Sequence, residues 1–471
     1  MSRMAVAAPL LLLLMASSAA GQSTEPAVFI TTYPNATQGK ITSFTMADDG
    51  MLTLVGVYDT SDTGAQTISL APDGRHLAMA HGTANGQVEQ LDIFAINSDA
   101  TLSFVLTELV PDSPLDVAWL RSDLLAVVQT DFPSTVGIYA FDEVNATLIE
   151  IDREDSGSFS SNVISHPHGR YVFVNDSSGN KVSAFEVSDV DGTITPTAAS
   201  ATSGMYPLGM GTTSTGGRLY VGGGISGGGD KVHGYAVSFD DGSLTALPGS
   251  PYTSPGDSPK LAVATPDDRY LFVGHGSDAT VRSFRIESDG SITSLGRSFD
   301  IGLQGTLGDI AMLDDYMLVT DNSSAVDGKS GVYVFRVNSD GSFSMVGSDL
   351  FDTQTSTPNT MAVWNPETGM YLDSSPLIGG TQARFEVTGA GNAQDTALVY
   401  SLAGPGRTPL YGQGITLGLL LPIELISVKT SDATGFVAWN RTIPSKASGR
   451  TVWMQAAQAG RVSNVIGRSV Q

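Results

Sequence analysis

The sequence predicts an all-β protein: a seven-bladed β-propeller with a second, smaller β-sandwich domain. Three observations support this fold class. The chain holds 53 Gly and only 15% charged residues, and short β-branched and aromatic runs are bounded by Gly, Asp, Asn and Pro, which is typical of strands and turns. One hairpin phrase also returns seven times. Because a chain of 471 residues is longer than a single hydrophobic core usually accommodates, we expect at least two domains.

The repeated phrase is an aromatic strand, a tight turn and the start of a second strand. Its copies are FTMADDGMLT (44–53), FAINSDATLS (94–103), FDEVNATLIE (141–150), FEVSDVDGTIT (185–195), YAVSFDDGSLT (235–245), FRIESDGSIT (284–293) and FRVNSDGSFS (335–344). Successive copies begin 44 to 51 residues apart. Five turns carry Asp-Gly, which adopts positive φ at least steric cost, and the other two carry Asp-Ala and Asn-Ala.

A second phrase precedes the hairpins and completes each repeat. In NVISHPHGRYVFVND (162–176) and LAVATPDDRYLFVGHG (261–276), a short strand, a polar turn and a large apolar strand follow one another. Each repeat therefore predicts four antiparallel strands. One such sheet cannot bury both faces, but seven packed radially can, which predicts a propeller over residues 24–366.

The two ends of the repeat array predict how the ring closes. The first unit starts directly at the apolar strand AVFITTY (27–33) and lacks the short strand that precedes it in the other units. That missing strand is found at the other end of the array, as NTMAVWNP (359–366). We therefore expect the last strand to complete the first blade.

Beyond residue 366 the repeat stops. Residues 367–380 are expected to form a linker, and residues 381–471 hold strands at spacings typical of a small β-sandwich. The run from GPG through TLGLLLP to TVWMQA resembles the Ig-like C-terminal modules of secreted bacterial proteins.

The motifs HPHGRYVFVNDSSGNKVSAFEV and TPDDRYLFVGHGSDATVRSFRI resemble the lactonase-type seven-bladed propellers, which are 6-phosphogluconolactonase-like and related to YVTN repeat proteins. The resemblance covers about residues 25–366. It implies a site with a Pro-Arg-His signature, in which cations hold an acidic lactone and a base activates water. Here SPKLAVATPDD places Lys260 and Leu261 at the Arg and His positions, and Asn162 stands where a channel-facing His is expected.

This departure from the signature favours a binding module with an eroded lactonase site, and lactone hydrolysis is the alternative. If the protein is a lactonase, Lys260 is the replacement cation. His275, one strand later in the same blade, is then the base by position. The opposing interpretation is that Lys260 is a solvated residue at the blade entry and that His275 is a loop residue.

The loops between the second and third strands of all blades should open on one end of the channel. They begin near Tyr33, His81, Asp131, Asp176, Gly224, His275 and Asp321, which form the candidate ligand-binding ring. His81 and His275 occupy equivalent positions, but no compact carboxylate–His spacing accompanies them, so we expect neither a metal nor another cofactor.

The beginning of the chain predicts export. Arg3, an apolar stretch over residues 5–15, and the small residues Ser18 and Ala20 form a secretory signal peptide (1–20). The apolar stretch is too short to span a membrane. With no Cys, the chain forms no disulfide, and its net charge of −24 argues against a nucleic-acid partner. We expect a secreted, extracellular or periplasmic monomer whose partner is an extracellular protein, a glycan or a small molecule.

Overall fold

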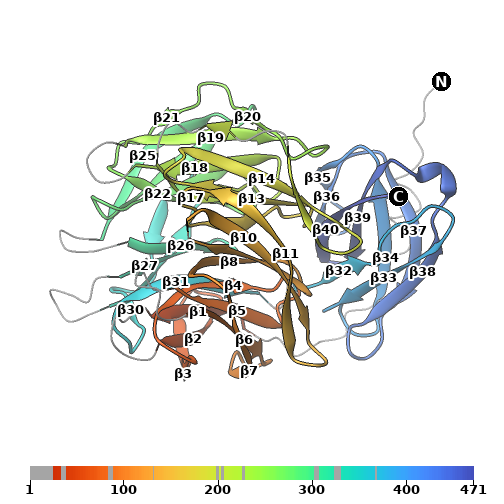
Figure 1. Ribbon diagram of the computed structural model, residues 1–471, viewed down its shortest axis with the longest axis horizontal. Coiled ribbons are helices and arrows are strands. Elements are labelled where there is room, and N and C mark those ends of the chain that lie inside the picture. Colours follow the sequence, from red (N-terminus) through yellow and green to blue (C-terminus); the bar gives the residue numbers. More distant parts are fainter. Residues whose placement is uncertain are drawn as a thin grey trace.

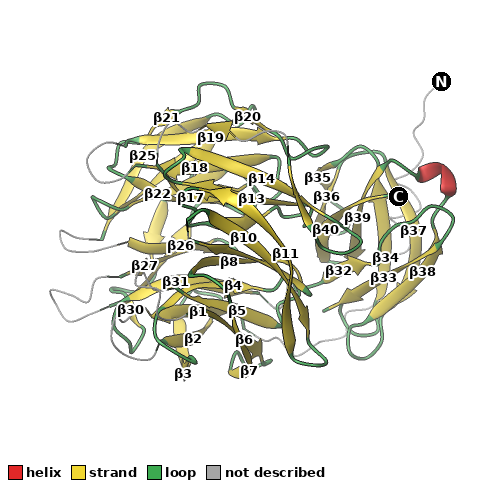
Figure 2. Cartoon of the chain, viewed as in Figure 1, coloured by secondary structure: helices red, strands yellow, loops and turns green. Residues whose placement is uncertain are grey.

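The computed structural model describes residues 25–471 apart from 33–38, 83–88, 131, 198–200, 203–205, 225–228, 302–306, 323–329 and 366–368. Within these residues the chain is built of strands, with a single 3₁₀ helix at Ser445–Ala447 (Figure 2), which confirms the all-β prediction. The expected signal peptide lies outside the described residues. The described part of the chain has no helix with the length and hydrophobicity that a membrane span requires.

Seven antiparallel sheets, here called blades 1 to 7 in chain order, follow one another along the chain (Figure 1). Blade 1 contains β1 (Ala27–Thr32), β2 (Lys40–Met46), β3 (Leu52–Asp59) and β31 (Pro358–Trp364). Blade 2 contains β4 (Ala65–Leu70), β5 (His76–His81), β6 (Gln90–Ile96) and β7 (Leu102–Leu109). Blade 3 contains β8 (Pro114–Arg121), β9 (Leu124–Gln129), β10 (Ser134–Asp142) and β11 (Thr147–Gly157).

The remaining blades repeat this order, and three of them add a short fifth strand. Blade 4 contains β12 (Val163–Ser165), β13 (Tyr171–Asp176), β14 (Lys181–Val187), β15 (Ile194–Pro196) and β16 (Ala201–Thr202). Blade 5 contains β17 (Pro207–Thr212), β18 (Arg218–Gly223), β19 (Lys231–Val237), β20 (Leu244–Ala246) and β21 (Tyr252–Thr253). Blade 6 contains β22 (Pro259–Ala264), β23 (Tyr270–His275), β24 (Thr280–Ile286) and β25 (Ile292–Asp300). Blade 7 contains β26 (Leu307–Leu313), β27 (Tyr316–Asp321), β28 (Gly331–Val337), β29 (Phe343–Met345) and β30 (Phe351–Asp352).

The innermost strands form a closed ring around the channel. Each innermost strand contacts the next one in the circle β31, β4, β8, β12, β17, β22 and β26, and β26 returns to β31. β31 pairs antiparallel with β1, so that Val28 lies opposite Val363, although the two strands are more than 300 residues apart in the chain. The predicted closure of the first blade by the last strand is therefore confirmed.

The repeated hairpins adopt the predicted turn conformation. The Gly residues of the five Asp-Gly turns all have positive φ, between 69° and 88°. In the other two turns Ala100 (φ 62°) and Ala146 (φ 49°) occupy the same position. A residue with a Cβ is strained in this conformation. In one of these turns Asp99 Oδ1 accepts from the Thr101 N–H at 3.1 Å, and in the other Asp142 Oδ1 accepts from the Asn145 N–H at 3.0 Å.

Neighbouring blades are also joined by buried tyrosines. Tyr220 donates its hydroxyl to the Gly290 carbonyl at 2.8 Å, and Tyr270 donates to the Ser339 carbonyl at 2.6 Å. In both cases the acceptor lies in the turn between the third and fourth strands of the next blade. Tyr316 makes the equivalent bond to the Asp48 carbonyl at 2.6 Å, which joins blade 7 to blade 1 across the closure.

The C-terminal unit begins earlier than the sequence predicts. The stretch 367–380, expected as a linker, contains β32 (Tyr371–Ser374), which pairs with β33 (Gln382–Thr388). The physical reason is that Met370, Tyr371 and Leu372 are buried apolar residues, which a linker would expose to solvent. The other strands are β34 (Asp395–Ser401), β35 (Pro405–Leu410), β36 (Ile415–Leu419), β37 (Ile423–Thr430), β38 (Val437–Thr442), β39 (Thr451–Gln458) and β40 (Arg461–Ser469).

Two sheets and a hairpin make up this unit. One sheet has the order β32-β33-β38 and the other β37-β34-β39-β40. An apolar cluster around the fully buried Trp439 lies between the two sheets. A second cluster combines the four-stranded sheet with the β35–β36 hairpin and includes Trp453 and Leu417.

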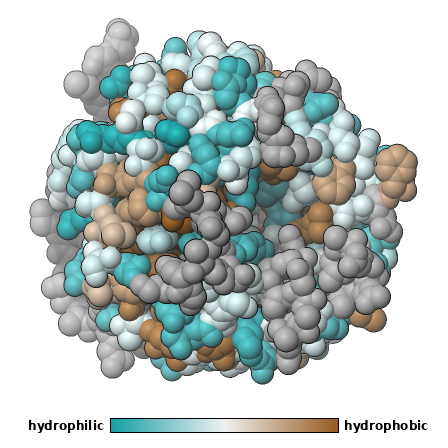
Figure 3. Space-filling model, turned by 90° about the vertical axis from the view of Figure 1, so that its left-hand side faces the viewer, coloured by the Kyte–Doolittle hydropathy of each residue, from teal (hydrophilic) through white to brown (hydrophobic). Residues whose placement is uncertain are grey.

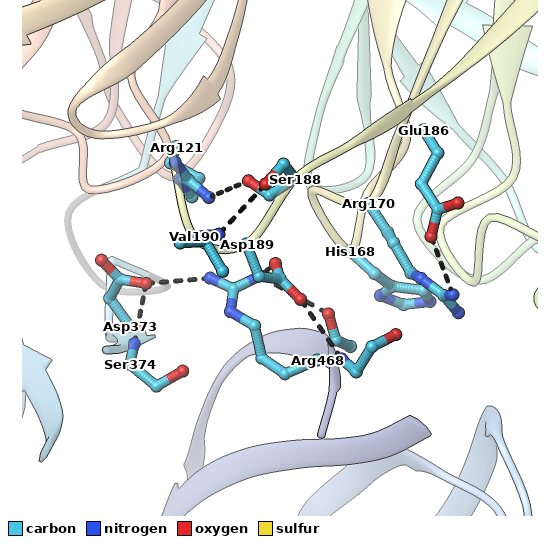
Figure 4. A network of polar contacts seen from close by, with 12 residues as sticks. Arg121, His168, Arg170, Glu186, Ser188, Asp189, Val190, Asp373, Ser374 and Arg468 are labelled. Atoms are coloured by element: carbon cyan, nitrogen blue, oxygen red, sulfur yellow. Dashed lines mark hydrogen bonds and ion pairs between the residues drawn. The ribbon is translucent and has the colours of Figure 1, made fainter. Parts of the chain in front are cut away.

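The C-terminal unit packs against one face of the propeller (Figure 1). At this contact Arg468 of β40 reaches between Asp189 of blade 4 (3.4 Å) and Asp373 of β32 (3.0 Å), and its side chain is only 3% exposed (Figure 4). Nearby, the ring nitrogens of His168 lie 3.3 Å from the Val465 carbonyl and 2.9 Å from the Thr215 carbonyl. The propeller residues at this contact lie in turns between the first and second strands of a blade or between the third and fourth, counted outwards from the channel. The loops between second and third strands, and the connections from one blade to the next, therefore lie on the opposite face.

Candidate functional site at the channel mouth

The innermost strands begin at the face of the propeller that lies away from the C-terminal unit. Figure 3 shows this face, on which hydrophilic residues surround patches of hydrophobic ones. A cavity of ≈290 Å³ is lined by residues next to or within the innermost strands of blades 4 to 7. Asn162, Met210, Leu261 and Asp309 are among its lining residues. In this cavity a ligand could contact several blades at once.

Two buried carboxyl groups join neighbouring innermost strands. Asp116 Oδ2 accepts hydrogen bonds from the Val163 N–H at 2.8 Å and from Asn162 Nδ2 at 2.6 Å, across the gap between blades 3 and 4. Asp309 Oδ2 accepts from the Met361 N–H at 2.9 Å, across the gap between blade 7 and the closing strand. Burial raises the pKa of each of these two carboxyl groups to about 6.

Lys260 provides the cationic group near Asp309. A register shift between Pro259 and Leu261 places Lys260 at a β-bulge, where a side chain can be re-aimed out of the regular alternation. Its stem lies so close to Gly276 that a Cβ at that glycine would be 3.1 Å from Lys260 Cδ. Burial lowers the pKa of Lys260, and the nearby charge of Asp309 opposes this effect. Among the described residues, no carboxylate forms an ion pair with Lys260 within 4.0 Å.

Asn162 adds an unused hydrogen-bonding group to the same cavity. Its Nδ2 donates to Asp116, whereas its Oδ1 is buried and has no hydrogen-bond partner among the described residues. A buried polar atom without a partner costs about 1–3 kcal/mol, so a ligand donor at this position would be favoured. Asn162 and Leu261, which replace the expected histidines, therefore give the cavity one polar and one apolar contact.

His81 and His275 lie inside their blades and not at the cavity. Both are fully buried at the end of the second strand. His81 Nδ1 lies 2.8 Å from the Thr63 carbonyl and its Nε2 lies 2.9 Å from Asp92 Oδ2. His275 Nε2 lies 2.7 Å from Ser254 Oγ, and burial lowers the pKa of His275. The structure therefore does not bring His275 to the cavity that Asp309 lines.

The other members of the predicted ring do not converge either. Asp176 Oδ1 accepts from the Gly179 N–H of its own loop at 2.8 Å and from the Phe159 N–H, in the connection before β12, at 3.1 Å. Asp321 is buried at the end of β27, opposite Leu307. Tyr33 and Asp131 lie outside the described residues. Within the described part of the chain, no group of three His, Cys, Asp or Glu residues could hold a metal ion.

All six histidines of the chain belong to the described residues, and none is on an innermost strand. His166 and His168 lie in the turn between β12 and β13, on the side of the C-terminal unit. Sequence reasoning missed Asp116 and Asp309 altogether. Their signal is the shared phrase Asp-Val-Ala at 116–118 and Asp-Ile-Ala at 309–311, at equivalent places of two repeats.

The seven radial sheets define the chain as a β-propeller protein with the fold of the lactonase-type propellers. Two putative 6-phosphogluconolactonases have similar structures. The one from Bacteroides fragilis has a TM-score of 0.60 and 14% identity, and the match covers 74% of this chain and all of that chain. The one from Bacteroides uniformis has a TM-score of 0.60, 16% identity and coverage of 72% and 100%.

A protein from Lactobacillus plantarum is also similar, with a TM-score of 0.59, 16% identity and coverage of 72% of this chain and 99% of that chain. At these identities the likeness shows the fold alone. No protein-family model and no curated protein sequence matches this chain.

Proposed function

We propose that the protein is a secreted propeller that binds a small acidic ligand, of the sugar-acid type, at the mouth of its channel. The proposal rests on Lys260, which directly precedes the lining residue Leu261, interacts electrostatically with the lining residue Asp309, and has no carboxylate ion-pair partner among the described residues. An ammonium group held near a partly apolar cavity attracts a carboxylate more strongly than one in bulk water. Asn162 Oδ1 provides an acceptor for a ligand hydroxyl.

The arrangement supports binding better than hydrolysis. A lactonase needs a general base near the ligand, and no histidine is on an innermost strand. Asp116 and Asp309, the carboxyl groups at equivalent positions of the channel wall, both accept backbone N–H groups from the next blade. These hydrogen bonds give the two carboxyl groups a role in joining the strands.

Lactone hydrolysis is a second candidate, and one observation favours it. Asp309 lines the cavity, lies close enough to Lys260 for their charges to interact, and has a pKa of about 6 because of its burial. A carboxyl group with such a pKa is suited to act as a general base near neutral pH. In this case Lys260 would hold the acidic substrate, and Asp309 would take the place that the sequence assigns to His275.

The proposal also extends to the whole chain. We infer that residues 1–20 direct export and are removed, because of the charged, apolar and small-residue order described above. The C-terminal unit is proposed to be an Ig-like β-sandwich domain, supported by its two facing sheets and its own apolar cluster. The mature protein is proposed to be a monomer.

Calorimetric titration with gluconate tests the binding function. We expect saturable binding to the parent protein, binding at least about tenfold weaker in Lys260→Met, and unchanged binding in Lys181→Met. Lys181 is a matched control because it begins a strand at the same face of the propeller, but has Asp176 as a partner at 3.9 Å. Equal binding by the parent and Lys260→Met would overturn the proposal.

A gluconolactone hydrolysis assay separates the two candidate functions. The binding proposal predicts no hydrolysis above the rate in buffer. Hydrolysis that is lost in Asp309→Asn and kept in His275→Gln would establish the second candidate and the role of Asp309 as its base.

A further inference from the structure

The C-terminal unit contains a second cavity, far larger than the one in the channel. Its volume is ≈570 Å³, within the range of about 300–1,000 Å³ found for small-molecule sites. The lining is mostly apolar and comes from both sheets, including Phe385 of β33, Met454 of β39 and Ile426 of β37. Leu402, at the edge of the cavity, is 49% exposed.

The topology explains why this cavity stays open. β37 and β38 follow one another in the chain but belong to different sheets and do not pair. Instead of a backbone ladder, two side chains bridge them: Lys429 Nζ donates to the Ala438 carbonyl at 2.6 Å, and Arg441 donates to Ser427 Oγ. The sandwich is therefore not sealed along this side, and its core can be reached from solvent.

Apolar residues that belong to the core remain incompletely covered here. Tyr400, Ile426, Ala447 and Val452 pack against the buried cluster around Trp439 but are only partly buried themselves, and all four line the cavity. Covering such surface stabilises a complex because apolar area is removed from water. An apolar ligand group that entered between the sheets would gain this contribution.

The charged residues that line the cavity are all basic. Arg441, Lys446 and Arg450 are exposed, and the lining residues include no Asp or Glu. Within the described chain, neither Lys446 nor Arg450 has an ion-pair partner within 4.0 Å. In a chain with a net charge of −24, three cations around one apolar cavity make a local positive rim.

We propose that this cavity binds a fatty-acid-like ligand, that is, an unbranched apolar chain with one carboxylate. The apolar chain lies between the two sheets, against Phe385 and Met454. The carboxylate lies at the rim, where Lys446 and Arg450 neutralise it. This site is separate from the channel mouth and does not depend on the function proposed there.

Titration of the full-length protein with dodecanoate below its micelle concentration tests this site, with dodecanol as the uncharged comparison. We expect saturable dodecanoate binding that is tighter than dodecanol binding. In Lys446→Ala/Arg450→Ala the affinity for dodecanoate should fall by roughly 2-fold to 30-fold, which corresponds to two exposed ion pairs of about 0.2–1 kcal/mol each. Dodecanol binding should not change in this variant.

Two further variants complete the experiment. Ala447→Trp fills the cavity and should abolish dodecanoate binding while gluconate binding is unchanged. Arg384→Ala is the control, because Arg384 is an exposed cation of the same unit that pairs with Glu386 and does not line the cavity. If Ala447→Trp does not fold, the double variant Lys446→Ala/Arg450→Ala, which changes only exposed residues, still tests whether the cavity binds dodecanoate. No saturable dodecanoate binding, equal affinity for dodecanol, or full binding in the double variant would overturn the proposal.

Discussion

Replacement of Asp309 by Ala tests how the propeller ring is closed. Asp309 Oδ2 accepts from the Met361 N–H of the closing strand at 2.9 Å, and its Oδ1 accepts from the Ile310 N–H at 2.8 Å. Asp309→Ala leaves both donors without this acceptor. Each unsatisfied buried N–H costs about 1–3 kcal/mol, so the hydrogen bonds alone predict a loss of roughly 2–6 kcal/mol in the free energy of unfolding.

The carboxyl group itself makes this loss depend on pH. Burial raises the pKa of Asp309 from an ordinary 3.8 to about 6 in the folded protein. The Asp309 carboxyl group therefore binds its proton more tightly in the folded state than in the unfolded state, and this proton binding adds to the free energy of unfolding. The contribution is fully present below the pKa of the unfolded state, and it is lost as the pH rises through about 6. At about pH 7.5 the parent protein buries an ionised carboxylate, which is unfavourable, and Asp309→Ala removes this cost. The variant is therefore destabilised less at this pH than the lost hydrogen bonds alone would predict.

The structure thus predicts a larger loss in acid. Between about pH 7.5 and about pH 4.5 the difference in unfolding free energy between the parent and Asp309→Ala should grow by roughly 2 kcal/mol. Urea denaturation at both pH values measures it. Asp289→Ala is the control, because Asp289 accepts the Ser291 N–H at 3.0 Å in an exposed turn. A loss that is equal at the two pH values, or that is smaller in acid, would refute this explanation of the closure.

Three further predictions concern the interface, the closing strand and the channel. Arg468→Ala should lower the free energy of unfolding, measured by urea denaturation, by about 3–5 kcal/mol, because it leaves Asp189, whose side chain is 7% exposed, without its cation. If the loss in the double variant Arg468→Ala/Asp189→Ala equals the sum of the losses in the two single variants, this pairing is contradicted. Deletion of Pro358–Trp364 should abolish the calorimetric unfolding transition of the propeller, since β1 loses its partner, and an unchanged transition would contradict the closure. Gluconate binding should weaken as the pH rises through the lowered pKa of Lys260, below the ordinary 10.5; a decline only above 10.5 would contradict this prediction.

The fold of the repeats could be predicted because its determinants are local. Asp-Gly turns, alternating apolar strands and the spacing of the hairpin phrase are all visible in the sequence, and the missing strand of the first unit indicated the closure. The boundary after the ring could not be predicted in the same way. Gly, Ser and Pro around Tyr371 and Leu372 are typical of a linker, and only the partner strand β33 makes this stretch a strand.

The site was harder to predict because position along a strand does not fix where a side chain points. His81 and His275 end their strands near the channel mouth, but both rings turn into the blade, where they meet Asp92 and Ser254. Lys260 lies at a β-bulge next to the lining residue Leu261 and interacts electrostatically with Asp309, and alternation alone does not predict such a bulge. The cavity of the C-terminal unit depends on two strands that do not pair, which is a property of the tertiary fold.

A crystal structure of the protein with bound gluconate would show whether Lys260 holds an acidic ligand at the channel mouth. We predict that the gluconate carboxylate lies within about 3.2 Å of Lys260 Nζ, a hydrogen-bonding distance, in the cavity lined by Asn162 and Asp309. Gluconate bound elsewhere, with Lys260 making no contact to it, would contradict the claim.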